Sequence, residues 1–264
     1  MDNKKMLVSV SLVLVLALFY LLSLVYAEPF GATVTPTNIS SAIADAPGSD
    51  NAYAGNVTEL AISGFSSTQS WQGYYGNVSG TIQLADSSDY VMYNWSAANP
   101  SGEVYASTND TINWLNIQCF NFTASGTYTN EAGNGGTTSQ YGTNLSALET
   151  DYGINASDVD GVDETFNLQG AGTHDQFYTA NQLFTQGQCR NTRVFDNTGA
   201  GVPNKFEEVL LYEPVSTSVV FASILENDAL GFNQRSSDFE MLVLEDGHGT
   251  NVASTPYYFF VELE

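Results

Sequence analysis

The chain has 264 residues, and its 29 Asp and Glu residues against 6 Lys and Arg give a net charge of −23. This balance argues against nucleic-acid binding and against docking on an anionic lipid surface, because both need clustered cations. About 237 residues follow the first 27, enough for one large β domain or two small ones.

The first 27 residues are a hydrophobic leader. Lys4 and Lys5 precede an uncharged run from Met6 to Ala27, and about 20 helical residues span the hydrocarbon core of a bilayer. The lysines favour the inside, so the rest of the chain is predicted to be extracytoplasmic. Two interpretations stay open: a signal peptide cut before Glu28, or a retained N-terminal membrane anchor. The protein is accordingly predicted to be secreted or membrane-anchored at the cell surface.

Residues 28–55 are rich in Ala, Pro, Ser, Thr and Asp without periodicity, which predicts a flexible linker. From residue 56 to 264 the pattern changes to short β-like runs separated by turn residues. The first such runs are VTELAISGF (57–65), WQGYYGNVSGTIQLAD (71–86), YVMYNW (90–95), GEVYAS (102–107) and INWLNIQCFNF (112–122).

A subdivision of this β region is expected near residues 124–165. A polar, glycine-rich stretch there predicts a long surface loop. The segment NLSALETDYG that follows predicts one short helix with Asn144 as its N-cap. DVDGVDETF (158–166) is then expected to return to strand.

The C-terminal third shows the clearest strand pattern. FEEVLLY (206–212) and VVFASILE (219–226) predict a hairpin with a six-residue loop, and 238–246 and 256–264 predict two further strands. The expected fold is therefore mainly β, an antiparallel sandwich of the immunoglobulin-like or jelly-roll-like kind. Two packed sandwiches are the alternative, and in either case one N-terminal hydrophobic helix precedes the fold.

Cys119 and Cys189 are the two cysteines. In an oxidising compartment they predict one disulfide, which would close a loop of about 70 residues and contribute ~4 kcal/mol in the chain-entropy model. Two buried free thiols are an alternative. A metal site built on them is a further one, although His174 and His248 are the only histidines available as ligands.

N-glycosylation motifs gather in the first part of the chain. Eight N-x-S/T motifs occur, and none follows the last of them. The alternative is chance in an Asn- and Thr-rich chain. The predicted acceptors are Asn38, Asn56, Asn77, Asn94, Asn109, Asn121, Asn144 and Asn155.

A candidate calcium loop is the sequence DVDGVDE. Asp158, Asp160, Asp163 and Glu164 surround Gly161, and closely spaced carboxylates with a turn glycine can wrap Ca²⁺. The alternative is a solvated acidic turn. No other cofactor is expected.

Aromatic residues on the predicted strands suggest a carbohydrate-stacking platform made of Trp71, Tyr75 and Trp95. Aromatic rings on strands also serve as core and cross-strand pairs, which is the competing interpretation.

The histidines suggest no strong catalytic site. GHGTNVAS (247–254) is similar to the histidine motif of subtilisin-like proteases, but only 16 residues follow His248 and they hold no serine motif. His174 with Asp175, or Asp246 with His248, would serve as a metal site or an acid–base pair only if the fold brought them together.

Three motifs carry a family resemblance: WQGYYGNVSGTIQL, NWLNIQCFNF, and the pair FEEVLLYEP and VVFASILEN. Over residues 54–264 the chain resembles a family of uncharacterised archaeal proteins that are secreted or membrane-anchored. The resemblance implies a location in the cell envelope and implies no reaction.

Together these features predict a non-enzymatic cell-surface or secreted glycoprotein with a structural, adhesive or envelope-interaction role. Its expected partners are envelope components or other surface proteins, and the membrane if the leader is retained. A carbohydrate-binding module is the first alternative, and an extracellular hydrolase or metalloenzyme is the second.

Overall fold

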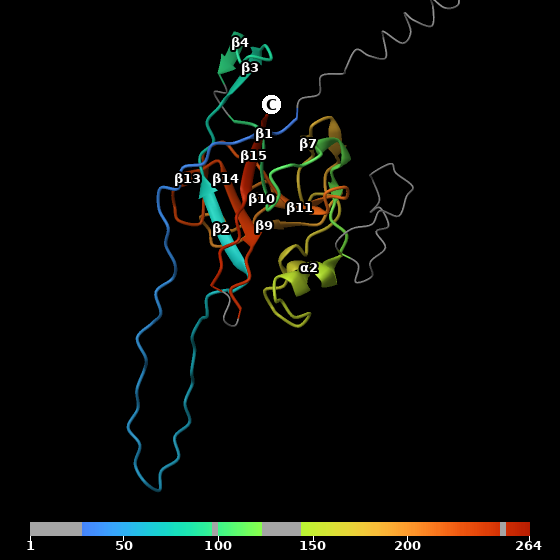
Figure 1. Cartoon of the computed structure of the whole chain (residues 1–264). Coiled ribbons are helices and arrows are strands. Elements are labelled where there is room, and N and C mark those ends of the chain that lie inside the picture. Colours follow the sequence, from blue (N-terminus) through green and yellow to red (C-terminus); the bar gives the residue numbers. More distant parts are fainter. Residues whose placement is uncertain (1–27, 97–99, 123–143, 249–251) are drawn as a thin grey trace, which may run out of the picture.

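The computed structural model describes residues 28–96, 100–122, 144–248 and 252–264, and the hydrophobic leader lies outside these ranges. The protein is mainly β, with antiparallel sheets and few helices (Figure 1). The largest sheet has the order β1–β15–β5–β11–β10–β6, and β9 also pairs with β10. Its strands are β1 (Phe30–Gly31), β5 (Gly102–Ser107), β6 (Gln118–Cys119), β9 (Asn191–Arg193), β10 (Glu207–Glu213), β11 (Ser218–Ile224) and β15 (Tyr258–Leu263).

The predicted C-terminal hairpin is confirmed as β10–β11, at the centre of this sheet. Leu210 pairs with Phe221, and Tyr212 pairs with Val219. Both strands carry apolar residues at successive positions, so the hairpin must be covered on both of its faces. All seven residues of β10 are buried, as this requires.

One face of the main sheet is covered by the ribbon of β2 (Trp71–Gly76) and β14 (Phe239–Leu244) together with α2 (Leu145–Asp151) and α3 (Val162–Thr165). The shared core contains Leu210, Phe221, Met241 and Val243, along with Leu148 and Val162 from the two helices. Residues on both sides of the expected boundary near 124–165 therefore pack into one core.

The other face of the main sheet is covered by the hairpin of β7 (Phe177–Thr179) and β8 (Gln182–Phe184) and by the 3₁₀ turn η1 (Trp114–Asn116). The disulfide between Cys119 and Cys189, with Cα atoms 5.2 Å apart, lies in this second core. The predicted pairing is thus formed. It ties the edge strand β6 to the segment that precedes β9.

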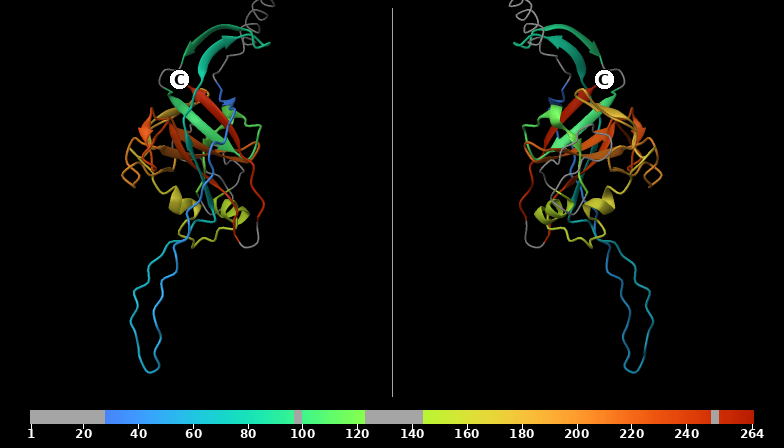
Figure 2. Two further views of the ribbon diagram at one scale, coloured as in Figure 1. Left: turned by 90° about the vertical axis from the view of Figure 1, so that its left-hand side faces the viewer. Right: turned by 90° about the vertical axis from the view of Figure 1, so that its right-hand side faces the viewer.

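Two further hairpins complete the described chain. β3 (Thr81–Ala85) pairs with β4 (Val91–Ser96), and β12 (Ala229–Leu230) pairs with β13 (Ser236–Ser237). The β3–β4 hairpin projects from the same end of the body as the C-terminus (Figures 1 and 2).

The structure corrects four of the predicted strands. The run INWLNIQCFNF forms the 3₁₀ turn η1 and the two-residue strand β6 instead of one strand. The run VTELAISGF forms no strand, and the long run from residue 71 to 86 divides at Gly76 into β2 and β3, which belong to different sheets. The segment DVDGVDETF forms the helical turn α3 instead of a strand. Its Gly161 is the N-cap, and Asp163 and Glu164 occupy the first turn, where acidic groups are favourable.

The predicted helix at 144–153 is present as α2. The Asn144 side chain accepts a hydrogen bond from the Ala147 backbone N–H at 2.9 Å, as an N-cap does. The predicted glycine-rich loop before it lies almost entirely outside the described residues.

Candidate functional site

The β3–β4 hairpin is amphipathic. Residues directly opposite each other in an antiparallel pair share a face. Ile82 faces Trp95 and Leu84 faces Tyr93, so these four side chains lie on one side. The other side carries Thr81, Gln83 and Asn94, together with Met92.

The apolar side of this hairpin is open to solvent. Its side chains are exposed by 40% at Ile82, 52% at Leu84, 60% at Tyr93 and 51% at Trp95. Within the described ranges β3 and β4 hydrogen-bond only to each other as strands. Contiguous exposed apolar side chains on a soluble domain mark an interaction site.

A second exposed apolar region is residues 32–69, which we call the arm. The arm contains no helix or strand and extends from the body as a long loop that returns to β2 (Figures 1 and 2). Its return half carries Val57, Leu60, Ile62 and Phe65, all at least 59% exposed. The short strand β1 lies just before the arm and pairs with β15, so the predicted linker starts from a fixed point.

The three residues predicted to form a carbohydrate platform do not gather. Trp71 packs on Phe166 and Phe221, with ring centroids 6.0 and 6.5 Å away, and its indole N–H donates to the Asp160 carbonyl at 2.7 Å. It is therefore partly buried and packed against the core.

Tyr75 and Trp95 stand in separate sheets, each beside another aromatic ring. Tyr75 meets Phe232 at 5.1 Å, and Trp95 meets Tyr93 at 4.9 Å with the ring planes inclined by 62°. The exposed aromatic rings of β4 therefore form this inclined pair, and they do not form a flat platform.

The acidic segment brings together only part of the predicted calcium set. Asp163 and Glu164 meet Glu149 of α2, and one ligand oxygen from each lies within 4.8 Å of the others. Asp158 instead accepts from the Asn155 backbone N–H at 2.8 Å, and Asp160 accepts from the Thr68 hydroxyl at 2.6 Å. Sequence reasoning missed Glu149, because α2 and α3 are adjacent only in the folded chain.

Electrostatics in this cluster reflect burial and like charge. Burial raises the pKa of Glu149, whose carboxylate accepts a hydrogen bond from the Val162 N–H at 3.2 Å. A hydrogen bond with Asp163 raises the pKa of Glu164. Crowded carboxylates of this kind are the ligands that Ca²⁺ prefers.

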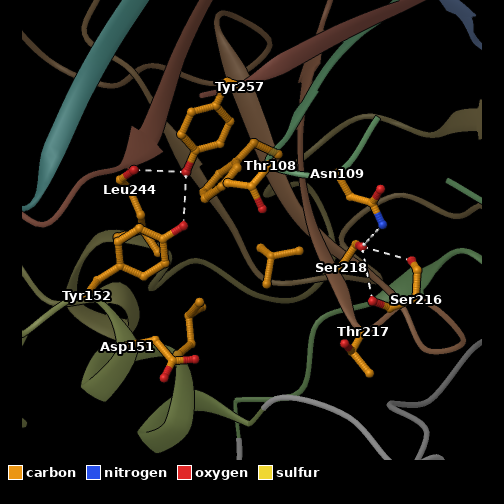
Figure 3. A pocket seen from close by; sticks show the side chains of 12 residues that line it. Thr108, Asn109, Asp151, Tyr152, Ser216, Thr217, Ser218, Leu244 and Tyr257 are labelled. Atoms are coloured by element: carbon orange, nitrogen blue, oxygen red, sulfur yellow. Dashed lines mark hydrogen bonds between the residues drawn. The ribbon is translucent and has the colours of Figure 1, made fainter. Parts of the chain in front are cut away.

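A cavity of about 270 Å³ lies between α2, the β10–β11 turn and the segment before β15 (Figure 3). The hydroxyls of Tyr152 and Tyr257 are 3.5 Å apart, and Tyr257 donates to the Leu244 carbonyl at 2.8 Å. Burial raises the pKa of both tyrosines, so both stay protonated at neutral pH. On the opposite wall, Asn109 donates to the Ser218 hydroxyl at 2.9 Å. The cavity presents hydroxyl groups that already bond one another.

The His174 ring links the backbone at Asp175 to the backbone at Cys189. It is fully buried, its Nδ1 lies 2.6 Å from the Asp175 carbonyl, and its Nε2 accepts from the Cys189 N–H at 3.2 Å. Burial lowers its pKa, so the ring is neutral at pH 7. Both ring nitrogens are therefore engaged in structure.

The fold places His248 beside Asp246, with Nδ1 and Oδ1 3.9 Å apart. Both side chains are 30% exposed. Across the described ranges, the Glu149–Asp163–Glu164 cluster is the one group of three or more possible metal ligands, and neither histidine belongs to it.

The glycosylation motifs fall into three environments. Asn121 is 1% exposed, so its amide is not accessible in the folded chain. Asn109 and Asn144 are half-buried, and both side chains accept backbone hydrogen bonds. The remaining acceptors are exposed: Asn38, Asn56, Asn77, Asn94 and Asn155.

No helix among the described residues is long and apolar enough to cross a membrane. No protein-family model, curated protein or solved structure matches the chain.

Proposed function

We propose that this chain is a non-enzymatic, extracytoplasmic glycoprotein of the cell surface that acts by binding other envelope components. In this proposal the two-faced β body is a sandwich of the immunoglobulin-like or jelly-roll-like kind that supports the binding elements. The observation that carries the proposal is the open apolar face of β3–β4, made of Ile82, Leu84, Tyr93 and Trp95. Exposing such a face to water is unfavourable, so burying it against a partner would stabilise the complex.

The location rests on two supports. The disulfide between Cys119 and Cys189 fits an oxidising compartment outside the cytoplasm. The hydrophobic run from Met6 to Ala27 would deliver the chain there, either as a cleaved signal or as a membrane anchor.

Glycosylation at the exposed motifs belongs to the same proposal. Asn94 is on the polar side of the hairpin, opposite the apolar face, so a glycan there would leave the binding face free. Buried Asn121 is left out of the proposed acceptors.

Intact mass spectrometry of the protein from its own envelope tests this proposal. We expect glycan mass on the chain, a disulfide that resists alkylation without reductant, and retention in the washed envelope fraction. For a chain whose leader has been cleaved, Trp95→Asp should release the protein into the wash, whereas Val159→Asp, which changes a side chain elsewhere that is 92% exposed, should not. An unglycosylated protein that both variants leave equally soluble and active on a small substrate would contradict the proposal.

Carbohydrate binding is the second candidate function, favoured by the two exposed rings of Tyr93 and Trp95. Isothermal titration with envelope oligosaccharides separates it from protein binding. Loss of sugar binding in Trp95→Ala with an unchanged unfolding midpoint would support it, and absence of sugar binding to the wild type would remove it.

A further inference from the structure

Two elements of this chain have strand-like character but lack a sheet to complete them. One is the β3–β4 hairpin, a two-stranded unit whose edges carry no other strand in the described part of the chain. Isolated two-stranded hairpins are at best marginally stable in water. A third strand that shares the apolar face would stabilise such a hairpin.

The other element is the return half of the arm, residues 57–65. In an extended chain, alternate side chains share a face. Leu60 and Ile62 therefore lie on the same side of this segment, and they are 59% and 88% exposed. Val57 and Phe65 lie on the opposite side, and the segment pairs with no strand in the described part of its own copy.

The arm and the hairpin lie at opposite ends of one molecule. They flank β2 in sequence, and both views show the arm leaving one end of the body while β3–β4 projects from the other (Figures 1 and 2). The hairpin of a copy is therefore out of reach of its own arm, whereas a neighbouring copy placed end to end could present its arm there.

Charge favours contact between residues 57–65 and the β3–β4 hairpin over contact between the acidic bodies of two copies. Copies with a net charge of −23 repel each other. The strands β3 and β4 contain no charged residue, and residues 57–65 contain only Glu59. Bringing these segments together therefore costs little repulsion compared with pairing the acidic bodies.

From this we propose that residues 57–65 of one copy add as a third strand to an open edge of β3–β4 in the next copy. Backbone hydrogen bonds along the hairpin edge would provide affinity, as in other cases of strand addition. Leu60 and Ile62 would extend the apolar face made by Ile82, Leu84, Tyr93 and Trp95. The proposal deepens the proposed function, on which it rests, by naming a second copy of this chain as the partner.

This contact is head-to-tail. Each copy donates an arm at one end and accepts one at the other, so the contact repeats and does not close on itself unless the rotation between copies happens to form a ring. The predicted product is a linear series of copies. The motif asparagine Asn94 lies on the face opposite the joined apolar side chains, so glycosylation there is compatible with assembly.

Engineered cysteines test the contact directly on the full chain purified from its own envelope. The native cysteines are already paired, so Leu60→Cys and Leu84→Cys each add one free thiol. We expect mild oxidation of a mixture of the two variants to give a cross-linked dimer containing one of each. A chain carrying both changes should give a ladder of multimers. Leu60→Cys mixed with Val159→Cys is the matched control and should stay monomeric.

Three outcomes would overturn the proposal. Cross-linking of Leu84→Cys only to itself would mean that two hairpins pack face to face, and cross-linking of Leu60→Cys only to itself would mean that arms pair with arms. Absence of cross-links, together with a blue shift of a fluorophore on Leu84→Cys when phosphatidylcholine vesicles are added, would assign the hairpin face to a membrane. In each case a glycosylated protein still held in the envelope would leave the proposed function standing. A released, unglycosylated monomer would remove both.

Discussion

The central hairpin β10–β11 and the projecting hairpin β3–β4 are both antiparallel strand pairs with apolar side chains, but their environments are opposite. In β10–β11, side chains such as Leu210 and Phe221 are at most 2% exposed, because a second layer covers each face of the sheet. In β3–β4, the cross-strand pair of Ile82 and Trp95 is 40% and 51% exposed. The difference teaches that apolar side chains on a strand pair mark a face to be covered without specifying which surface covers it.

Truncating one aromatic ring in each hairpin should give the largest contrast. Phe221→Ala opens a cavity in the body and is expected to cost about 3–5 kcal/mol of unfolding free energy. Trp95→Ala removes a ring that is half in solvent, and we expect a change within about 0.5 kcal/mol. Urea titration followed by circular dichroism measures both. Similar losses in the two variants would show that the projecting hairpin is part of the cooperative core.

Removing the disulfide tests how firmly the edge strand β6 is tied to the body. The double change Cys119→Ser with Cys189→Ser frees a loop of about 70 residues and should lower stability by about 2–4 kcal/mol. The far-ultraviolet spectrum should stay that of a β protein below the lowered midpoint. Scanning calorimetry measures the effect, and reduction of the wild type provides the control. An unchanged midpoint would mean that packing alone holds β6.

A pair of buried carboxyl groups predicts unusual pH dependence for the body. Glu103 and Glu262 lie directly opposite on β5 and β15, and the Tyr105 hydroxyl is 3.4 Å from the first and 3.3 Å from the second. Burial raises the pKa of Glu262 to about 7 and that of Glu103 well above its usual range, with added repulsion from neighbouring carboxylates. The folded state therefore binds more protons than the unfolded state above about pH 4.3.

Stability from these groups is fully present below about pH 4.3 and falls as the pH rises through about 7. We expect the unfolding midpoint to drop by several degrees between pH 5 and pH 8, a loss of about 1–2 kcal/mol once partial solvent screening is allowed for. Glu262→Gln should reduce this dependence without abolishing it, because burial also raises the pKa of Glu226 and Glu240 to about 7. Glu59→Gln, on the exposed arm, is the matched control and should retain it. A midpoint that rises with pH over this range would contradict the prediction.

The smallest effect is expected from calcium at the junction of α2 and α3. Ca²⁺ at about ten times its dissociation constant would add ~1.4 kcal/mol to folding if Glu149, Asp163 and Glu164 bind it together. Thermal unfolding with CaCl₂ or with a chelator measures this. Glu149→Gln keeps an acceptor for the Val162 N–H but removes a charge, so it should abolish the calcium response. A response that persists in Glu149→Gln would place the ion elsewhere.

Local patterns predicted several elements correctly because their signals are carried by adjacent residues. Asn144 marks the start of α2 through a hydrogen bond to a residue three positions on. The continuous apolar runs of β10 and β11 require burial on both faces, and the structure provides it. The prediction of a strand at VTELAISGF was wrong, because no strand in the described part of the chain pairs with this segment.

The sequence by itself determined a mainly β, strongly acidic chain with a hydrophobic leader and two cysteines, because composition, periodicity and cysteine count depend on no distant contact. Only the tertiary structure decided that Cys119 pairs with Cys189, that Trp71 packs against the core, that Glu149 joins Asp163 and Glu164, and that Asn121 is buried. It alone also placed the arm and the apolar face of β3–β4 at opposite ends of the molecule. These outcomes depend on which surfaces meet across long separations in sequence, and periodicity carries no information about the partner that covers a face.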